Sequence, residues 1–274
     1  LTELGRARTV PAPTCHIALD RTGRCLMTAS YHGGMIGLNP VLDNGLIGDE
    51  TEVHRHSGSS VLPVQNQPRP HSAFISPDNR YVVVPDLGLD KVFIYKLDTE
   101  NRSLQFHREV RTAPGAGPRH FAFHPSRPYG YVINELNSTV IAYSYDGVNG
   151  ELVEKQTVST LPVSHQGENA CAHIELSPDG RFLYASNRGH DSIAIFAVNP
   201  EDGLLEPVDH VSVLGQHPRH FTLSPDGAHL LVANRDTNNV TVFARDGATG
   251  RLTPTGGSLN LSKPVCVRFL AKTL

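Results

Sequence analysis

The sequence predicts an all-β fold, a β-propeller of four-stranded antiparallel blades, and two observations lead to it. The 274 residues include 24 Gly and 20 Pro, and these turn formers separate short apolar runs, with few helix-forming stretches. In addition, one segment recurs along the chain with a period of roughly 50 residues, which is typical of propeller blades.

The recurring segment combines a β-rich run with a turn. Clear copies begin at His71, Arg119, Ala172 and Arg219, and a weaker copy begins at Cys15. Each run ends in a turn signal such as Ser-Pro-Asp-Gly, whose first residues are Asp20, Ser76, His124, Ser177 and Ser224. Such a turn predicts an antiparallel hairpin after the first strand of each blade.

The rest of each repeat predicts three further strands. Second strands are expected at 81–84, 129–133, 182–185 and 230–233, and third strands at 91–95, 139–143, 192–196 and 240–243. Hairpin signals at Asp146-Gly, Asp202-Gly and Asp246-Gly then introduce a fourth strand. Four such strands make one blade.

The strand count predicts five complete blades in a single domain over residues 1–274. Residues 1–10 resemble the last strand of a preceding blade, and residues 264–269 the first strand of a following one. Because a propeller closes to remove its exposed edges, we expect an N-terminally truncated form of a larger ring. A degenerate six-bladed ring is the alternative.

Composition excludes several classes of function. The net charge of −3 offers no basic surplus for a nucleic acid, and no apolar run approaches a membrane span. No signal peptide is evident. Cys15, Cys25, Cys171 and Cys266 show no CxxC spacing, which predicts buried, reduced thiols in a cytoplasmic protein.

Two columns of the aligned repeats hold the candidate functional residues. The first, at the start of the innermost strand, contains Cys15, His71, Arg119, Ala172 and Arg219. The second, at the end of the next strand, contains Tyr31, Leu87, Glu135, Arg188 and Arg235. Because the two strands are antiparallel, both columns should meet around the mouth of the central channel.

Neighbouring columns are interpreted as structural. His16, His120, His173 and His220 point the other way along their strand and should make a repeated hydrogen bond. Asp86, Asn134, Asn187 and Asn234 are expected to bond the backbone of their own turn. His54 and His56 are expected in a solvated loop, and Pro114–Pro118 lacks the spacing of a phosphate loop.

The chemistry of the two columns favours binding or catalysis over a network that merely ties blades together. Guanidinium groups bind phosphate or carboxylate in a bidentate manner. A His and a Glu beside them supply proton transfer near neutral pH. We expect no metal and no cofactor.

Longer motifs resemble a known family. Val84-Pro-Asp-Leu-Gly-Leu-Asp, Pro114-Gly-Ala-Gly-Pro-Arg-His-Phe, Asn134-Glu-Leu-Asn-Ser-Thr-Val and Asp179-Gly-Arg-Phe-Leu-Tyr-Ala-Ser-Asn-Arg-Gly are similar to the lactonase family of seven-bladed propellers. This family includes 6-phosphogluconolactonases and a carboxy-cis,cis-muconate cyclising enzyme. The resemblance implies seven blades in the complete ring.

The resemblance also implies site residues. The His, two Arg and Glu proposed for the muconate enzyme fall here on His71, Arg119, Glu135 and Arg188. One departure is Arg69-Pro-His71, where the family often has His-x-His, so any role of the first His is in doubt in this chain.

The implied activity is that of a 6-phosphogluconolactonase of the pentose phosphate pathway. His71 or Glu135 would act as general base, Arg119 or Arg188 would stabilise the oxyanion, and Arg219 and Arg235 would bind substrate. The expected partner is a phosphorylated or carboxylated lactone. A muconate cycloisomerase and a non-catalytic propeller scaffold are the alternatives.

Overall fold

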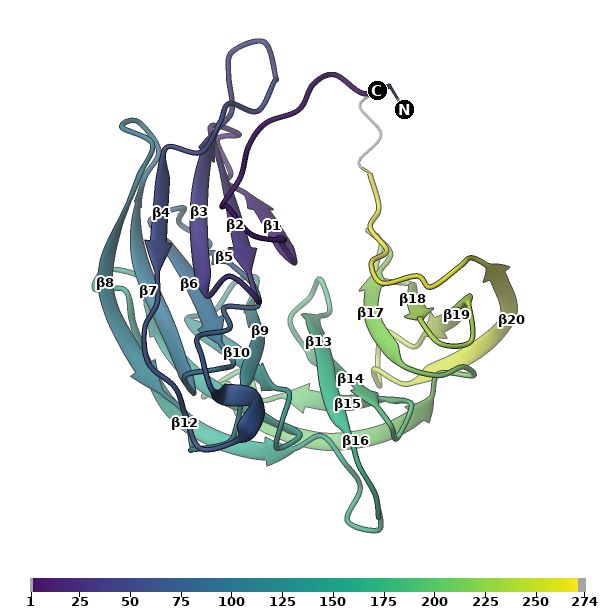
Figure 1. Cartoon of the computed structure of the whole chain (residues 1–274). Coiled ribbons are helices and arrows are strands. Elements are labelled where there is room, and N and C mark those ends of the chain that lie inside the picture. Colours follow the sequence, from purple (N-terminus) through teal and green to yellow (C-terminus); the bar gives the residue numbers. More distant parts are fainter. Residues whose placement is uncertain (1, 271–274) are drawn as a thin grey trace. The chain divides into compact units, whose positions relative to one another are not determined.

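The computed structural model describes residues 2–270, which form five four-stranded antiparallel sheets, each in sequential strand order (Figure 1). The fold is therefore an all-β propeller fold with the five predicted blades. The chain divides into two compact units, which are described separately. Unit 1 runs to Phe121 and includes Tyr145–Leu152; unit 2 comprises Ala122–Ser144 and the chain from Val153.

The strands follow the predicted order. The first sheet contains β1 (His16–Leu19), β2 (Cys25–Ser30), β3 (Met35–Pro40) and β4 (Glu52–Arg55). The second contains β5 (Phe74–Ile75), β6 (Tyr81–Asp86), β7 (Lys91–Asp98) and β8 (Ser103–Arg111), preceded by the short helix η1 (Pro63–Gln65). The third contains β9 (Pro118–Phe123), β10 (Tyr129–Asn134), β11 (Thr139–Asp146) and β12 (Glu151–Ser159). The fourth contains β13 (Ala170–Leu176), β14 (Phe182–Arg188), β15 (Ser192–Val198) and β16 (Leu205–Ser212). The fifth contains β17 (Pro218–Leu223), β18 (His229–Asn234), β19 (Asn239–Arg245) and β20 (Leu252–Asn260).

The Ser-Pro-Asp-Gly segments form the predicted first turns. In the fourth sheet the hydroxyl of Ser177 donates to the carboxylate of Asp179 at 2.5 Å and accepts the N–H of Phe182 at 3.0 Å. Ser76 and Ser224 make the same pair of contacts in their own sheets. The side chain therefore replaces missing backbone partners at the turn, which is why the motif recurs.

The two end segments correct the prediction. Residues 2–10 and 264–269 form no strand. Near the first of these, Arg8 uses its carbonyl to accept the N–H of Glu50 at 3.1 Å and gives its own N–H to the carboxylate of Asp49. Isolated contacts of this kind do not make a ladder, and a β-rich composition alone does not form a strand.

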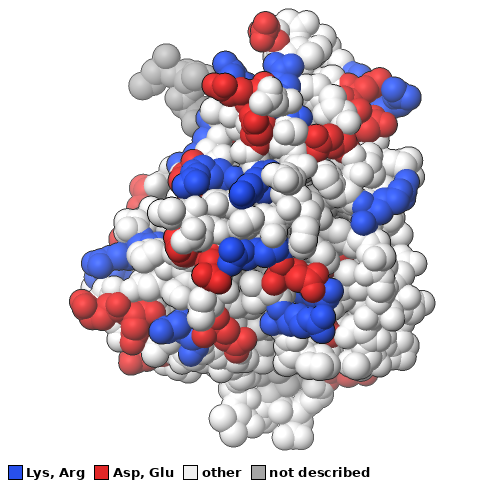
Figure 2. Space-filling view, turned by 90° about the vertical axis from the view of Figure 1, so that its left-hand side faces the viewer, with Lys and Arg blue, Asp and Glu red and all other residues white. Residues whose placement is uncertain are grey.

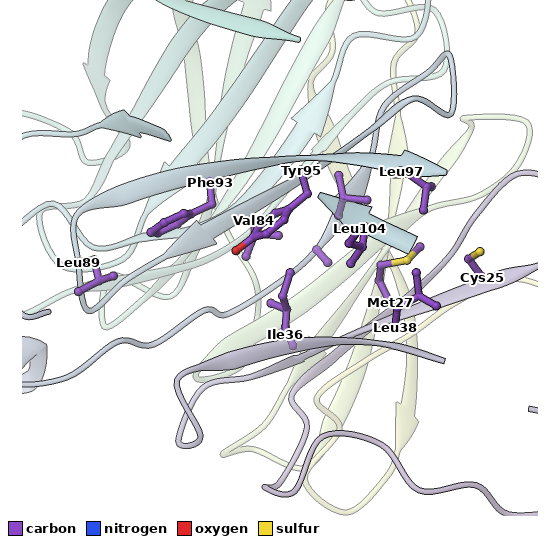
Figure 3. Close-up of a cluster of buried hydrophobic side chains, with 13 residues drawn as sticks. Cys25, Met27, Ile36, Leu38, Val84, Leu89, Phe93, Tyr95, Leu97 and Leu104 are labelled. Carbon is purple, nitrogen blue, oxygen red and sulfur yellow. The ribbon is translucent and has the colours of Figure 1, made fainter. Parts of the chain in front are cut away.

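The apolar core of unit 1 lies between its two complete sheets. Met27, Ile36 and Leu38 of the first sheet face Val84 and Tyr95 of the second, and all five are buried (Figure 3). Strands β2 and β6 are buried along their whole length, so apolar residues occupy both faces of each. Burying a side chain of this size contributes about 1.5–3 kcal/mol, so packing between the two sheets stabilises unit 1.

A column that sequence reasoning missed connects consecutive blades. It follows the second strand, and its members all have positive φ, between 52° and 63°: Gly34, Asp90, Ser138, Asp191 and Asn238. Their carbonyls accept N–H groups at 2.9–3.0 Å from His56, Thr112, Thr160, Val213 and Leu261, respectively. Each bond holds the segment that leads to the next blade, and therefore helps to position the first-column residue of that blade.

A second repeated contact joins a hairpin glycine to an aromatic ring of the preceding blade. A Cβ atom on Gly150, Gly203 or Gly250 would lie 2.3–2.6 Å from the rings of Tyr81, Tyr129 and Phe182, respectively. These three glycines also have φ of 60–75°, so both backbone conformation and space require glycine.

Replacing Gly250 with Ala is therefore expected to destabilise the protein by about 2–5 kcal/mol, because backbone strain adds to an overpacked contact with Phe182. Gly256 is the matched control: it lies on β20 with φ of 80°, and a Cβ there meets nothing within 4 Å. Gly256→Ala should cost only the backbone share, about 1–2 kcal/mol. Denaturant unfolding measures both variants, and equal losses would contradict the packing role of Gly250.

The expectation of a solvated loop is corrected at His56. His56 is not solvated: its side chain is 2% exposed, lies 2.6 Å from the Asp86 carboxylate and stacks on Phe93. The sequence hides this contact because Asp86 and Phe93 belong to the next blade.

Buried thiols are confirmed for Cys25 and Cys171, and burial raises the pKa of both to about 11.

The thiol prediction is wrong for Cys15 and Cys266, which are exposed because they lie outside the strands. None of the four cysteines forms a disulfide among residues 2–270.

On the face shown in Figure 2, basic and acidic side chains are interspersed, as expected of a solvated surface. Over the same residues, no helix has the length and apolar character needed to cross a bilayer.

Candidate functional site

Both predicted columns lie at the same end of their sheets. In unit 1 the N–H of His71 donates to the carbonyl of Pro85, just before the second-column residue Leu87. In unit 2 Ala170, at the start of β13, pairs with Arg188, at the end of β14. In these two sheets the antiparallel register therefore brings the start of the inner strand close to the second-column position.

In unit 1, His71 lies in a group of aromatic side chains. It is 6% exposed, and its ring meets the rings of Tyr31 and His120 edge to face, at centroid distances of 5.6 and 5.2 Å. The guanidinium of Arg69 covers the Tyr31 ring at 4.8 Å. Arg69, where the family that the sequence resembles often has His, thus supplies a cation beside the aromatic group that contacts His71.

Arg119 is also buried, at 2% exposure. Its Nη1 lies 3.2 Å from Nε2 of His120, so His120 contacts both candidate residues of unit 1. Asp90 positions the loop before Arg119, because its carboxylate accepts the N–H groups of Gly115 and Gly117 at 2.7 Å each. The Pro114–Pro118 segment is therefore a loop that leads to Arg119.

In unit 2, Arg188 and Glu135 form an ion pair. Nη2 of Arg188 lies 2.9 Å from Oε2 of Glu135, with side-chain exposures of 8% and 17%. The guanidinium also donates to the carbonyls of Ala170 and Cys171 at 3.1 and 2.6 Å. Arg188 is therefore fixed by three partners, one of which is the Glu135 carboxylate.

Arg235 and Arg219 complete the predicted residues of unit 2. Arg235 is half-buried, and its Nε and Nη2 donate to the two carboxylate oxygens of Asp236 at 2.6 and 3.1 Å. Arg219 is half-buried at the start of β17. Both guanidinium groups therefore lie at the same end of the fifth sheet.

Sequence reasoning missed His217, which lies among these arginines. Burial, followed by the charges of Arg188 and Arg235, lowers the pKa of His217 to about 4. The carboxylate of Asp191 accepts the backbone N–H of His217 at 2.8 Å, and the φ of His217 is 60°. The available signal was a His two residues before Arg219, where the other strong repeats have Arg69, Gly117 and Ala170.

The neighbouring columns are partly as expected. In the histidine column, Nδ1 of His16 and Nδ1 of His220 accept the backbone N–H groups of Ala73 and Val267 at 3.4 and 3.5 Å, respectively. In each case the donor belongs to the following segment of the chain. The column is therefore structural at these positions.

The Asp/Asn column is more varied. Asp86 bonds its own turn through the N–H of Gly88 at 3.0 Å, as predicted. The prediction is wrong for Asn187 and Asn234, whose amides donate to the carbonyls of Thr160 and Val213 in the preceding blade connection. These amides therefore hold neighbouring blades together.

Glu175, on β13, gives unit 2 a pH-dependent stability. Its side chain is 24% exposed, Oε2 lies 3.5 Å from Nε2 of His173, and burial raises the pKa of the carboxyl to about 7 from 4.5. The folded state thus keeps a proton that the unfolded state has lost between these two values. Stability is therefore expected to fall as pH rises from about 4.5 to 7, by at most about 3 kcal/mol.

Glu175→Gln should remove this dependence. Denaturant unfolding of both proteins across pH 4–8 measures it, with the stability difference between variant and wild type growing in favour of the variant as pH rises. A difference that stays constant across this range would contradict the assignment.

Residues 2–270 include no group of three or more His, Cys, Asp or Glu side chains arranged to hold a metal ion. Guanidinium groups can bind anions, and the carboxylate and imidazole groups can accept a proton.

Comparison with known proteins places the chain in a family. Residues 1–269 match the model described as "Lactonase, 7-bladed beta-propeller". The chain is 41% identical to a 6-phosphogluconolactonase of Bacillus subtilis, covering 95% of this chain and 74% of that protein. It is 38% identical to a 6-phosphogluconolactonase of Klebsiella pneumoniae, covering 80% of this chain and 62% of that protein.

A solved structure of a related protein has a similar fold. The periplasmic gluconolactonase of Pseudomonas aeruginosa is 37% identical and superimposes with a TM-score of 0.90, covering 97% of this chain and 75% of that one. The chain therefore spans about three quarters of two of these relatives and less than two thirds of the third. The family match over nearly the whole chain shows that this protein belongs to the lactonase family of seven-bladed β-propellers.

Proposed function

We propose that the protein is a 6-phosphogluconolactonase, which hydrolyses 6-phospho-D-glucono-1,5-lactone to 6-phosphogluconate. The names of its relatives support this substrate, and the observation that carries the proposal is the Arg188–Glu135 pair with three further arginines in the same two columns. An anionic lactone needs cations for its phosphate and for the charge that develops on its carbonyl oxygen.

The proposed step is ester hydrolysis by water. Glu135 accepts a proton as the water oxygen bonds to the lactone carbonyl carbon, and Arg188 stabilises the oxyanion that forms. When the tetrahedral intermediate collapses, the bond from the carbonyl carbon to the ring oxygen breaks. That oxygen takes the proton from Glu135 and leaves as a hydroxyl.

The remaining candidates complete the proposal. Arg219 and Arg235 bind the phosphate, because their guanidinium groups suit its oxygen atoms. His71 is the second candidate for the base, and Arg119 the second candidate for oxyanion stabilisation. The count of seven blades is carried over from the family; the described residues supply five sheets. The single domain and the cytoplasmic location stay predictions.

A substrate profile tests the function. Hydrolysis of 6-phosphogluconolactone should exceed its spontaneous rate and exceed that of the lactone without phosphate, and 3-carboxy-cis,cis-muconate should not be cyclised. His71→Ala serves as a comparison that reports whether this histidine takes part. Muconate cyclisation without lactone hydrolysis would favour the cycloisomerase instead. A folded protein inactive on all three compounds would favour a scaffold.

A further inference from the structure

One carboxylate in unit 2 serves two basic side chains. Asp236 binds the fork of Arg235 through both oxygens, at 2.6 and 3.1 Å. Its Oδ2 also lies 3.4 Å from Nδ1 of His217. Asp236 is 42% exposed and His217 is 22% exposed, so the histidine is the more buried of the two side chains.

Burial and the surrounding charges lower the pKa of His217 to about 4, which favours the neutral imidazole near pH 7. Burial is the largest cause of its lowered pKa, and the cations Arg188, Arg235 and Arg219 add to it, opposed only by Asp236. The carboxylate of Asp191 accepts the backbone N–H of His217. Nε2 of His217 is buried and has no hydrogen-bond partner among residues 2–270. The imidazole is therefore an unused proton acceptor beside three guanidinium groups.

We propose that binding of an anionic ligand group shifts the Asp236 carboxylate from its ion pair with Arg235 to an ion pair with His217. A dianion that binds the arginines draws the Arg235 fork away from Asp236. The carboxylate then lacks its partner, and the two negative charges of the ligand offset the cations that disfavour imidazolium. His217 takes one proton from solvent and pairs with Asp236, so that no carboxylate is left without a counter-charge.

The exchange would make His217 a specificity residue. A phosphate dianion offers enough charge to displace Asp236 from Arg235, while a lactone without phosphate offers none. Binding of the phosphorylated compound is thereby linked to uptake of a proton. The choice of phosphate as the natural ligand rests on the proposed function, but the exchange itself requires only a dianion.

Titration calorimetry with sulfate at pH 6, in two buffers of different ionisation enthalpy, tests the proposal. Sulfate does not titrate there, unlike a phosphate monoester, whose second pKa is about 6. Wild type should take up as much as about one proton per sulfate bound. 6-Phosphogluconate should behave alike at pH 7.5, and gluconate should cause no uptake.

The variants follow from the local backbone. His217→Asn suits the positive φ at this position and should abolish the uptake, as should Asp236→Asn. His210→Gln is the matched control, because His210 is a half-buried histidine of the same unit that donates through Nε2 to the Thr160 carbonyl. It should leave the uptake unchanged.

Sulfate binding without proton uptake, uptake that persists in His217→Asn, or no binding of either dianion would overturn the exchange. These measurements involve no turnover. Proton uptake in a protein that hydrolyses no lactone would therefore reject the proposed function and keep the exchange. Lactone turnover without proton uptake would reject the exchange and keep the proposed function.

Discussion

Glu135→Gln is expected to lower kcat for 6-phosphogluconolactone by about 10²–10⁴-fold, with little change in KM. Gln has nearly the same shape and can still accept a hydrogen bond from Arg188, but it cannot accept the proton of the attacking water. The effect should therefore fall on the chemical step. Steady-state hydrolysis, corrected for the spontaneous rate, measures it.

Glu206→Gln is the matched control, because Glu206 is an exposed glutamate on β16 of the same unit. Its variant should retain wild-type kcat. If Glu135→Gln also retained wild-type kcat, the proton acceptor would have to be the other candidate, His71.

Arg188→Gln is expected to reduce turnover by about 10²–10³-fold, the usual cost of losing one oxyanion donor. A second loss should appear in stability, because the variant leaves the Glu135 carboxylate without its counter-charge. Breaking a buried pair costs about 3–5 kcal/mol, and the partial exposure of Glu135 places this pair at the lower end.

The double variant Glu135→Gln/Arg188→Gln separates these effects. It should recover part of the lost stability, because no unpaired charge remains, yet it should recover no turnover. Chemical unfolding and hydrolysis rates measured on the same samples give both quantities. Recovery of turnover in the double variant would contradict both roles, because neither side chain would then be needed for the chemical step.

The repeat predicted the sheets and the ends of strands at which Glu135, Arg188, Arg219 and Arg235 lie. Local chemistry suffices for this, since a Ser-Pro-Asp-Gly turn and alternating strands determine each blade from its own residues. The ion pair of Glu135 with Arg188 could not be predicted, because it joins two sheets about one repeat apart in sequence.

The errors have the same origin. His56 was placed in solvent because its partners, Asp86 and Phe93, belong to the next blade. His217 was missed because it precedes the aligned column and its importance comes from charges on three other segments. Composition describes one repeat well, whereas contacts between repeats require the folded chain.

Lactone hydrolysis is expected to depend on the arginines of the two columns. The most direct test is the rate of 6-phosphogluconolactone hydrolysis by wild type and by the double variant Arg119→Gln/Arg188→Gln, with folding checked by circular dichroism. We expect turnover above the spontaneous rate in wild type and none above it in the folded double variant. Undiminished turnover in that variant would contradict this expectation.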